Sequence, residues 1–433
     1  MHSRPAPDWR SLLALYWVTS FVEGLGVAQI YAFLPNRLTE VGLAAPDVGR
    51  FVGVLGALFF LSGLPFIPLW GVWADKYSRK AVIIRSAIVE AVVFSLVAAS
   101  QAPWQLVVAM LLVGFQLGNS GVMMAAIRDV TPNHRLGLAM GFFAASSPLG
   151  FGAGPAIGSL MIDQLHFTSA AVFALAAALS VGVALMLAVA SSEVRPEVVP
   201  TGSTLRLASA AVRGVMSDPI VRWLFVVYGV VFVGRQMSAQ YMSLLVHNVE
   251  HTSLEVAGSV GLVLGVAALV GAAVSPAGGW VADRLGFRPV LVGATAGVAV
   301  ALTFLPLAST VAGLAVAYSL AIAFQTVVGA MVSGLLATEV PAERRSATLN
   351  LIYLPLYIGG ITGPAIGAGV VTAGLRAVFY VAAGVLGVAT LLALAFAWRT
   401  GGGRSRLPAA AGADTAAARA IDAAAKRAAD RFD

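Results

Sequence analysis

The chain has 433 residues, of which 59% are hydrophobic and only 11% charged, and its mean hydropathy is +0.88. A soluble globular protein carries about 25% charged residues, so this composition excludes a water-facing surface and indicates a chain embedded in lipid along its length. The net charge of +7 arises in loops between apolar runs, which excludes a nucleic-acid-binding face, and the absence of cysteine excludes disulfides and thiolate metal sites.

The polar N-terminus, residues 1–10, leads into an apolar run that is too long for the core of a signal peptide. No cleavage site of small residues follows it, so we expect an uncleaved first span. A membrane-crossing helix needs about 20 mostly apolar residues. The sequence predicts twelve such spans, at residues 11–35, 48–70, 80–100, 104–127, 138–162, 168–190, 219–246, 255–278, 289–308, 311–337, 346–372 and 375–398.

The expected fold class is therefore an all-α membrane protein with twelve transmembrane helices in two pseudo-symmetric six-helix bundles. The connections are short except for a cytoplasmic linker at 191–218, where a surface helix is expected around residues 205–216. This linker separates an N-terminal bundle at 1–190 from a C-terminal bundle at 219–398. Residues 399–433 form an alanine-rich tail, which we expect to be mobile and cytoplasmic.

The distribution of basic residues predicts the orientation of the chain. If the N-terminus is cytoplasmic, only Arg37, Arg50 and Arg376 of the 27 Lys and Arg lie outside, and Arg85 and Arg235 fall within spans. The asymmetry predicts a multi-pass protein of the inner or plasma membrane with both termini in the cytoplasm.

Motifs of the first half return in the second half at a nearly constant offset. The matched elements are the charged turns at 71–80 and 279–288, the loops around Pro132 and Pro341, and the Gly-Pro elements at 150–158 and 359–367. Asp75 and Asp283 stand 208 residues apart, and the other two pairs are offset by 209. Three motifs at nearly the same offset indicate two homologous bundles.

These motifs resemble the major facilitator superfamily over about residues 10–398. The Gly-Pro element of the fifth span looks like the one associated with the twelve-helix drug:proton antiporters of that family. The resemblance implies two halves that rock around a central site. That branch usually carries an arginine in the fourth span, linked with proton coupling, whereas the best-fitting position here is Met110.

Two charged residues fall mid-way along spans that occupy equivalent places in the repeat, Glu23 in the first and Arg235 in the seventh. A charge at the bilayer centre costs ~2.5–3.5 kcal/mol on insertion scales, so it persists only when paired, hydrated or functional. The resemblance implies that these spans line the central cavity, and we expect Glu23 and Arg235 to face it from opposite sides. Glu23 is then the best proton carrier; a structural ion pair is the alternative. Glu90 in the third span is a second proton-coupling candidate, although a structural partner is the favoured interpretation.

Further polar residues are candidates for the wall of a substrate cavity. They are Gln116 and Asn119 of the fourth span, Gln236 and Gln240 of the seventh, Gln325 of the tenth, and Tyr353 and Tyr357 of the eleventh. The amides suit a polar or mixed ligand, and the tyrosines suit a flat or cationic one. Interhelical hydrogen bonding and packing are equally good explanations.

The charged turns predict a gate. Asp75 is expected to accept hydrogen bonds from Arg79 or to face a helix N-terminus of the other bundle, and Asp283 with Arg284 repeats the arrangement. The alternative is that the basic residues only fix topology. Four prolines predict bends in the fifth and eleventh spans, namely Pro148, Pro155, Pro355 and Pro364.

The sequence thus predicts a secondary active transporter that exports small amphipathic or lipophilic compounds by proton exchange. The alternatives are a facilitator or importer of a small polar or anionic nutrient, and a non-transporting receptor or scaffold. No ATP-binding loop and no cluster of an enzyme's acid, base or metal residues occurs, so we expect neither an enzyme nor a cofactor, with H⁺ as the coupling ion. The expected partners are the lipid bilayer and a small-molecule substrate, and one monomer supplies both bundles.

Overall fold

The computed structural model describes residues 8–116, 118–196, 201–250, 256–339, 351 and 353–399, and the regular structure of these residues is entirely helical. Eleven helical stretches among them are long and apolar enough to cross a membrane. The elements in chain order are α1 (Trp9–Glu40), α2 (Ala45–Leu61), η1 (Leu64–Phe66), α3 (Ile67–Lys76), α4 (Arg79–Ala99), α5 (Pro103–Val113), α6 (Asn119–Val130), η2 (Asn133–Arg135), α7 (Leu136–Ser159), η3 (Leu160–Gln164), α8 (Ser169–Ala190), α9 (Thr204–Met216), α10 (Pro219–Val249), α11 (Val256–Leu285), α12 (Phe287–Phe304), η4 (Leu305–Leu307), α13 (Val311–Glu339), α15 (Tyr353–Val370), η5 (Val371–Ala373) and α16 (Leu375–Arg399).

Polar caps determine where several helices begin. The carboxylate of Asp8 accepts from the backbone of Arg10 and Ser11 at the start of α1, and Asp218 accepts from Ile220 at the start of α10. Each cap satisfies amide groups that have no partner inside the helix. The helix α1 begins two residues before the predicted first span at 11–35, whereas α10 begins at the predicted residue, Pro219. The helix expected around residues 205–216 is α9; the loop around Pro341 and the tail beyond Arg399 lie outside the described residues.

The prediction of one continuous fourth span at 104–127 is wrong. The helix stops after Val113 and resumes at Asn119, because Gly118 has a left-handed backbone with φ of 98°. The break leaves the carbonyl of Gln116 without a helical partner, and it accepts instead from the Ser86 hydroxyl and from Nη2 of Arg85 at 3.3 Å. Hydrogen bonds from α4 therefore stabilise the break in the helix, which the mostly apolar composition of the span does not reveal.

The second predicted span is interrupted at the same level, between α2 and α3. The hydroxyl of Ser62 donates to the carbonyl of Leu111 at the end of α5. A Cβ on Gly114 would meet Ser62 and Gly63, so the two interruptions pack directly against each other. Small residues permit this close approach.

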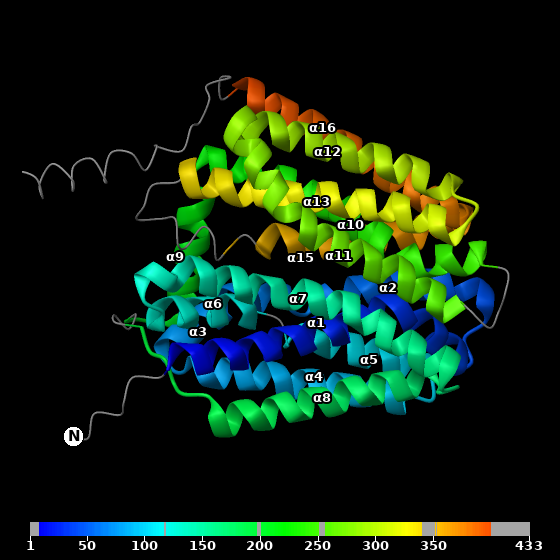
Figure 1. Cartoon of the computed structure of the whole chain (residues 1–433), viewed down its shortest axis with the longest axis horizontal. Helices are drawn as coiled ribbons and strands as arrows, with labels where there is room; N and C mark the ends of the chain where they lie inside the picture. Colours follow the sequence, from blue (N-terminus) through cyan, green and yellow to red (C-terminus); the bar gives the residue numbers. More distant parts are fainter. Residues whose placement is uncertain are drawn as a thin grey trace, which may run out of the picture.

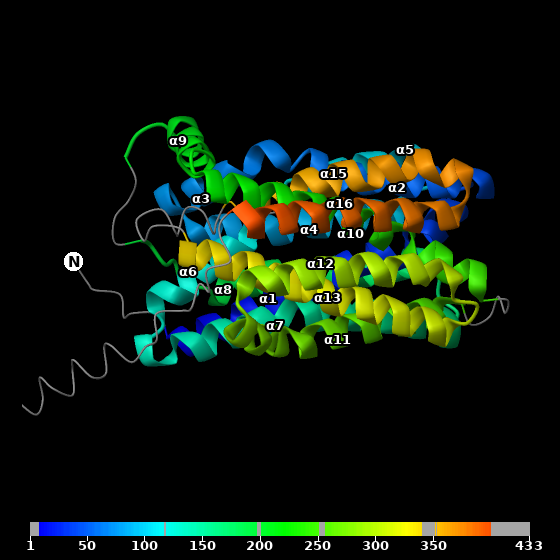
Figure 2. The same cartoon turned by 90° about the horizontal axis from the view of Figure 1, so that it is seen from above.

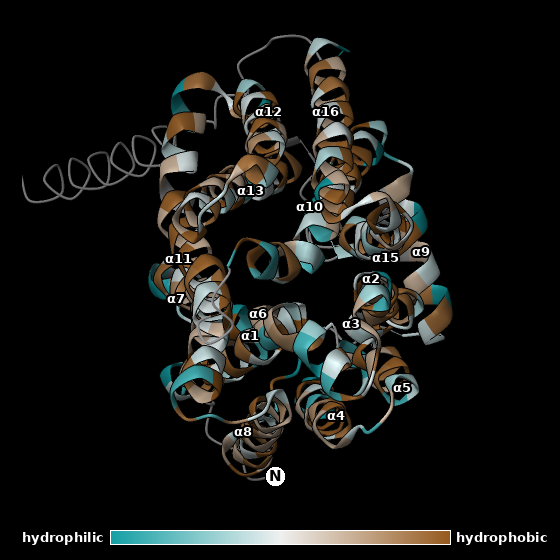
Figure 3. Ribbon diagram, turned by 90° about the vertical axis from the view of Figure 1, so that its right-hand side faces the viewer, coloured by the Kyte–Doolittle hydropathy of each residue, from teal (hydrophilic) through white to brown (hydrophobic). Residues whose placement is uncertain are grey.

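The helices before α9 pack mainly on one another, and so do those after it (Figures 1 and 3). We call α1–α8 the N-terminal half and α10–α16 the C-terminal half. The halves meet along two seams, α7 against α11 and α2 against α15. Figure 2 shows these seams on two sides of the molecule.

The two seams are built alike from the matched Gly-Pro elements. A Cβ on Gly53 of α2 would lie 2.6 Å from the carbonyl oxygen of Pro364, and a Cβ on Gly261 of α11 would lie 3.0 Å from that of Pro155. Gly53 and Gly261 are 208 residues apart, and the prolines 209. The repeat in sequence is therefore also a repeat of inter-half contacts.

The helix α9 lies at the end of the molecule where α1 begins, which we call the linker side (Figure 1). At the opposite end, the far side, the halves are joined directly. The Ser159 hydroxyl donates to the Ala257 carbonyl at 2.6 Å, and the Asp163 carboxylate accepts from the backbone N–H of Gly258. The same end brings Gly49 against Val371, whose Cγ2 would lie 3.0 Å from a Cβ on the glycine.

Candidate functional site

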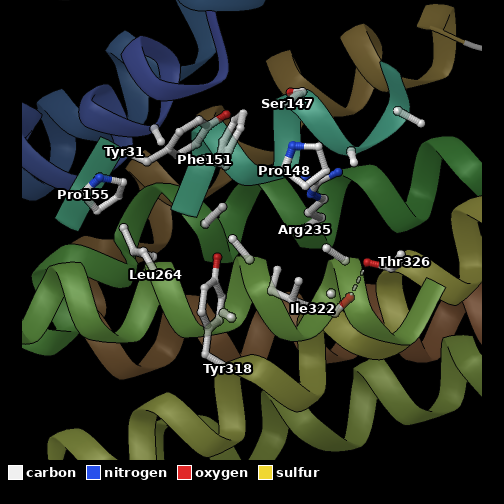
Figure 4. Close-up of a pocket in the computed structure, with 18 of the residues that line it drawn as sticks. Tyr31, Ser147, Pro148, Phe151, Pro155, Arg235, Leu264, Tyr318, Ile322 and Thr326 are labelled. Carbon is white, nitrogen blue, oxygen red and sulfur yellow. Dashed lines mark hydrogen bonds between the residues drawn. The ribbon is translucent and has the colours of Figure 1, made fainter. Parts of the chain in front are cut away.

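Among the described residues, a cavity with a volume of about 640 Å³ lies between the halves. Its walls come from α1 and α7 on one side and from α10, α11 and α13 on the other, as Figure 4 shows. Most of its lining is small and apolar, and among its larger residues are Phe151, Leu264 and Ile322. We call it the Arg235 cavity, because that guanidinium supplies the one formal charge among its lining residues.

Arg235 projects into this cavity from α10 (Figure 4). Its guanidinium carbon lies 5.2 Å from the centre of the Phe232 ring, and no described carboxylate forms an ion pair with it. Two phenols, Tyr31 of α1 and Tyr318 of α13, line the same space. The Gln236 amide donates to the Tyr31 hydroxyl at 2.9 Å and so connects α10 of the C-terminal half to α1 of the N-terminal half.

The second cavity, of about 340 Å³, contains Glu23 and extends to Asp75 towards the linker side. We call it the Glu23 cavity. The amide Nδ2 of Asn119 donates to Oε2 of Glu23 at 3.0 Å. Tyr353 and Tyr357 of α15 form part of its wall, and the Tyr357 ring meets the edge of Phe60 with centroids 5.5 Å apart. Glu23, Asn119 and both tyrosines, chosen separately from the sequence, therefore come together.

The structure does not place Glu23 and Arg235 across one shared space. Glu23 lines the smaller cavity, whereas Ala28 and Tyr31, further along the same helix, line the larger one. Successive positions along α1 thus line different cavities. The structure also contains no ion pair between Glu23 and Arg235.

The remaining polar candidates lie away from both cavities. Glu90 is 4% exposed and sits inside the N-terminal half, where Gly26 of α1 packs against its carboxylate. Gln240 packs on Gly56 of α2, so it belongs to a seam. Neither Gln116, which is 1% exposed, nor Gln325 lines either cavity. Met110, at the position of the family's usual arginine, is fully buried among apolar residues.

The first charged turn forms a compact ionic cluster on the linker side. Arg79 donates from Nε and Nη2 to the Asp75 carboxylate, each at 2.9 Å, and from Nη1 to Asp129 at 2.7 Å. The Glu193 carboxylate, from the chain after α8, accepts from the backbone N–H of Arg79 at 2.9 Å and from the Ser78 hydroxyl. We call these five residues the Arg79 cluster. All of them belong to the N-terminal half or its exit, and sequence reasoning missed Asp129 and Glu193 because only the fold brings them to Arg79.

The second charged turn is more open. Asp283 and Arg284 are both exposed, and the Arg284 guanidinium stacks 3.6 Å from the centre of the Trp280 ring. The repeat therefore preserves the residue types of the first turn but not its ionic contacts among the described residues.

Three of the four prolines lie at the Arg235 cavity or at a seam between the halves. Pro148 and Pro155 of α7 line the Arg235 cavity, and Pro364 of α15 contacts α2 at Gly53. Pro355 packs near Gly229 of α10.

Three residues of these contacts were not predicted from the sequence. Asp163 and Ser159 join the halves at the far side, and Tyr318 lines the Arg235 cavity. The available signal for Asp163 was an acidic residue at the end of a span.

The sequence matches the Major Facilitator Superfamily model over residues 16–280 and 254–428. It is 27% identical over 401 residues to the multidrug resistance protein MdtG of Enterobacter lignolyticus (strain SCF1), across 89% of this chain and 92% of the relative. The MdtG of Klebsiella pneumoniae (strain 342) is 27% identical over 396 residues, across 89% and 93%.

Solved structures show the same fold. A mutant of the nucleoside transporter NupG superimposes with a TM-score of 0.75 at 14% identity, over 89% of this chain and 99% of that one. The human organic anion transporter MFSD10 (TETRAN) gives a TM-score of 0.64 at 18% identity, over 89% and 100%. With its helical membrane fold and its cavity between two halves, the chain belongs to the major facilitator superfamily and is a multi-span membrane transporter.

Proposed function

We propose that the chain is a secondary active transporter that exports small amphipathic or lipophilic compounds in exchange for protons by alternating access. The observation that carries this proposal is the Arg235 cavity, an apolar space of about 640 Å³ between two halves that are joined at the far side. A volume of ~300–1,000 Å³ is typical of sites for small molecules. The similarity to multidrug resistance proteins supports the same class of cargo.

In this proposal α5 and α6 together make one broken span, so that twelve spans form two six-helix bundles divided by the linker at 191–218. The matched seams support this division. Both termini lie in the cytoplasm of the inner or plasma membrane, and one monomer suffices. The linker side is then cytoplasmic, and the joined far side corresponds to a state open to the cytoplasm.

Glu23 carries the proton in this scheme. It is a half-buried carboxyl group within a span, it lines a cavity that reaches Asp75 near the linker side, and its one hydrogen-bond donor among the described residues is Asn119. A carboxyl group in lipid that is not held in an ion pair is suited to gaining and losing a proton during the cycle. Glu90 serves as a structural residue instead.

Reconstituted protein tests the proposal. A panel of fluorescent amphipathic compounds of each charge is presented to proteoliposomes, and at least one should be driven uphill by an imposed pH gradient. Glu23→Gln should abolish gradient-driven flux while binding persists, because the near-isosteric amide cannot exchange a proton. Glu90→Gln is the matched control and should stay coupled. Unchanged coupling in Glu23→Gln would contradict the carrier role.

The alternative of a facilitator or importer is favoured by one feature, the positive charge in the Arg235 cavity, which suits an anionic nutrient. It predicts downhill uptake that ignores the pH gradient. A receptor or scaffold predicts no flux at all. The same liposomes therefore distinguish all three functions.

A further inference from the structure

We propose that the cargo of the Arg235 cavity is an amphipathic oxyanion, a compound with one carboxylate, sulfonate or similar group on an aromatic or aliphatic body. The proposal deepens the proposed function and rests on it for the transport step. It concerns which charge the site selects, which neither the family nor the similarity to multidrug resistance proteins specifies.

The first support is the balance of charge in the cavity. Among the twenty residues that line it there is one guanidinium and no carboxylate. A cationic cargo would therefore meet repulsion from Arg235 and find no counter-charge, whereas an anion would neutralise it. Because most of the lining is apolar, the attraction is screened less than at an exposed surface.

The second support is that the protein supplies no anionic partner for this guanidinium among the described side chains, although the Phe232 ring lies 5.2 Å from it. The acidic residues on the helices that pack against α10 lie elsewhere. Glu23 of α1 is in the other cavity, and Glu40 of the same helix pairs with Arg37 at 2.9 Å. Asp47 of α2 is exposed near the far side, Asp283 of α11 is exposed on the linker side, and Glu339 is the last residue of α13. An intramembrane guanidinium with no anionic protein partner is expected to face water or an anionic ligand.

The third support is the set of hydrogen-bond donors around Arg235. The Tyr31 hydroxyl accepts from the Gln236 amide, so its own O–H remains to donate. Tyr318 presents a second phenol from the opposite wall (Figure 4). A guanidinium binds oxyanions in a bidentate manner, and two phenols complete a donor set around such a group. Leu264, Ile322 and Phe151 offer apolar surface to the body of the cargo.

The separation of the two cavities makes this selectivity compatible with proton exchange. Glu23 can change its charge in one cavity without meeting the anion in the other. Export of an anion and import of a proton both move positive charge inward. The exchange would therefore be driven by the membrane potential as well as by the pH gradient.

Three fluorescent probes with one dansyl body test the selectivity directly: anionic dansylglycine, neutral dansylamide and cationic dansylcadaverine. Their binding to the purified full chain is measured by fluorescence titration without any gradient, so the result does not depend on the proposed direction or coupling. Wild type should bind dansylglycine about tenfold or more tightly than either other probe, since a hydrogen bond to a charged group contributes ~1.5–3 kcal/mol. Preference for the cation, equal affinities, or no saturable binding of dansylglycine overturns the proposal.

Variants at Arg235 test whether its guanidinium causes the preference for dansylglycine. Arg235→Gln should remove the preference for dansylglycine and leave dansylamide affinity unchanged, and Arg235→Lys should retain part of the preference. Equal losses for all three probes in Arg235→Gln would indicate a structural role and overturn the assignment. Thermal unfolding of each variant shows whether it is folded. If the variants are misfolded, the affinities of the wild type for the three probes decide whether the cavity prefers an anion.

Discussion

At the scale of single residues, Arg79 is the centre of the ionic contacts on the linker side of the N-terminal half. Its side chain is 3% exposed, yet it is fully paired, because Asp75 and Asp129 accept from its guanidinium and Glu193 accepts from its backbone N–H. The cluster joins α3, α4, α6 and the chain that leaves α8. A buried charge held by this many partners costs most when one of them is removed.

We therefore predict that Arg79→Gln destabilises the protein by about 1–3 kcal/mol, less than a fully buried pair because Asp75 and Asp129 remain partly exposed. The loss leaves two carboxylates near each other without their shared cation. Thermal unfolding in detergent measures the effect.

Arg128→Gln is the matched control for that measurement. Arg128 also pairs with Asp129, at 3.1 Å, but its side chain is 53% exposed. An exposed ion pair contributes about 0–1 kcal/mol, so the control should unfold close to the wild type. If Arg128→Gln lowered the stability as much as Arg79→Gln, burial of the arginine would not explain the stability that the ion pair contributes.

At the scale of helices, the seams depend on glycines that let α2 and α11 approach the prolines of the opposite half. Gly261 illustrates this dependence, because a Cβ there would overlap the Ser159 side chain and lie 3.0 Å from the Pro155 carbonyl oxygen. Such an atom forces α7 and α11 apart near the far side. If the halves move as rigid units, the second seam must respond as well.

We predict that Gly261→Ala exposes a cysteine introduced at Ala368, a residue 8% exposed that lies in the other seam against Gly53. The readout is the rate of modification by a membrane-impermeant maleimide. Gly182→Ala is the control, since a Cβ on Gly182 of α8 meets nothing within 4 Å. It should leave the rate unchanged and stabilise the helix by roughly 0.5–1 kcal/mol. An unchanged rate in Gly261→Ala would mean that the clash is absorbed locally.

The helices and the repeat were accessible to prediction, because both depend on local signals. Runs of apolar residues give the spans, and the offset of about 209 residues aligns Pro155 with Pro364, which occupy equivalent seams. The break at Gly118 was not accessible, since residues 104–127 are apolar enough overall to be read as one span and the stabilising donors, Ser86 and Arg85, come from another helix.

The candidate site shows the same limit. Helical periodicity places Glu23 and Asn119 on definite faces of their own helices, and these two side chains do meet. It does not fix how one helix is rotated against its neighbour. For this reason the pairing of Glu23 with Arg235 in one space was expected from equivalent positions in the repeat, while the structure gives each a cavity of its own.

At the scale of the whole molecule, alternating access requires the far side to separate in each cycle. The contacts at that end include Gly49 of α2 and Val371 of η5, where a Cβ on the glycine would lie 3.9 Å from the valine Cβ. Disulfides join Cβ atoms about 3.5–4.5 Å apart, so a cysteine pair fits here without movement of the backbone. The chain has no cysteine of its own, so the only thiols would be the introduced ones.

We predict that oxidation of the double variant Gly49→Cys/Val371→Cys stops transport and that reduction restores it. Binding of the dansyl probes should persist in the oxidised form, because both cavities lie on the linker side of the bond. Each single cysteine variant, treated with the same oxidant, should transport at its untreated rate and serves as the control. If the cross-linked protein transported as fast as the same variant after reduction of the disulfide, any mechanism in which the halves separate at the far side would be contradicted.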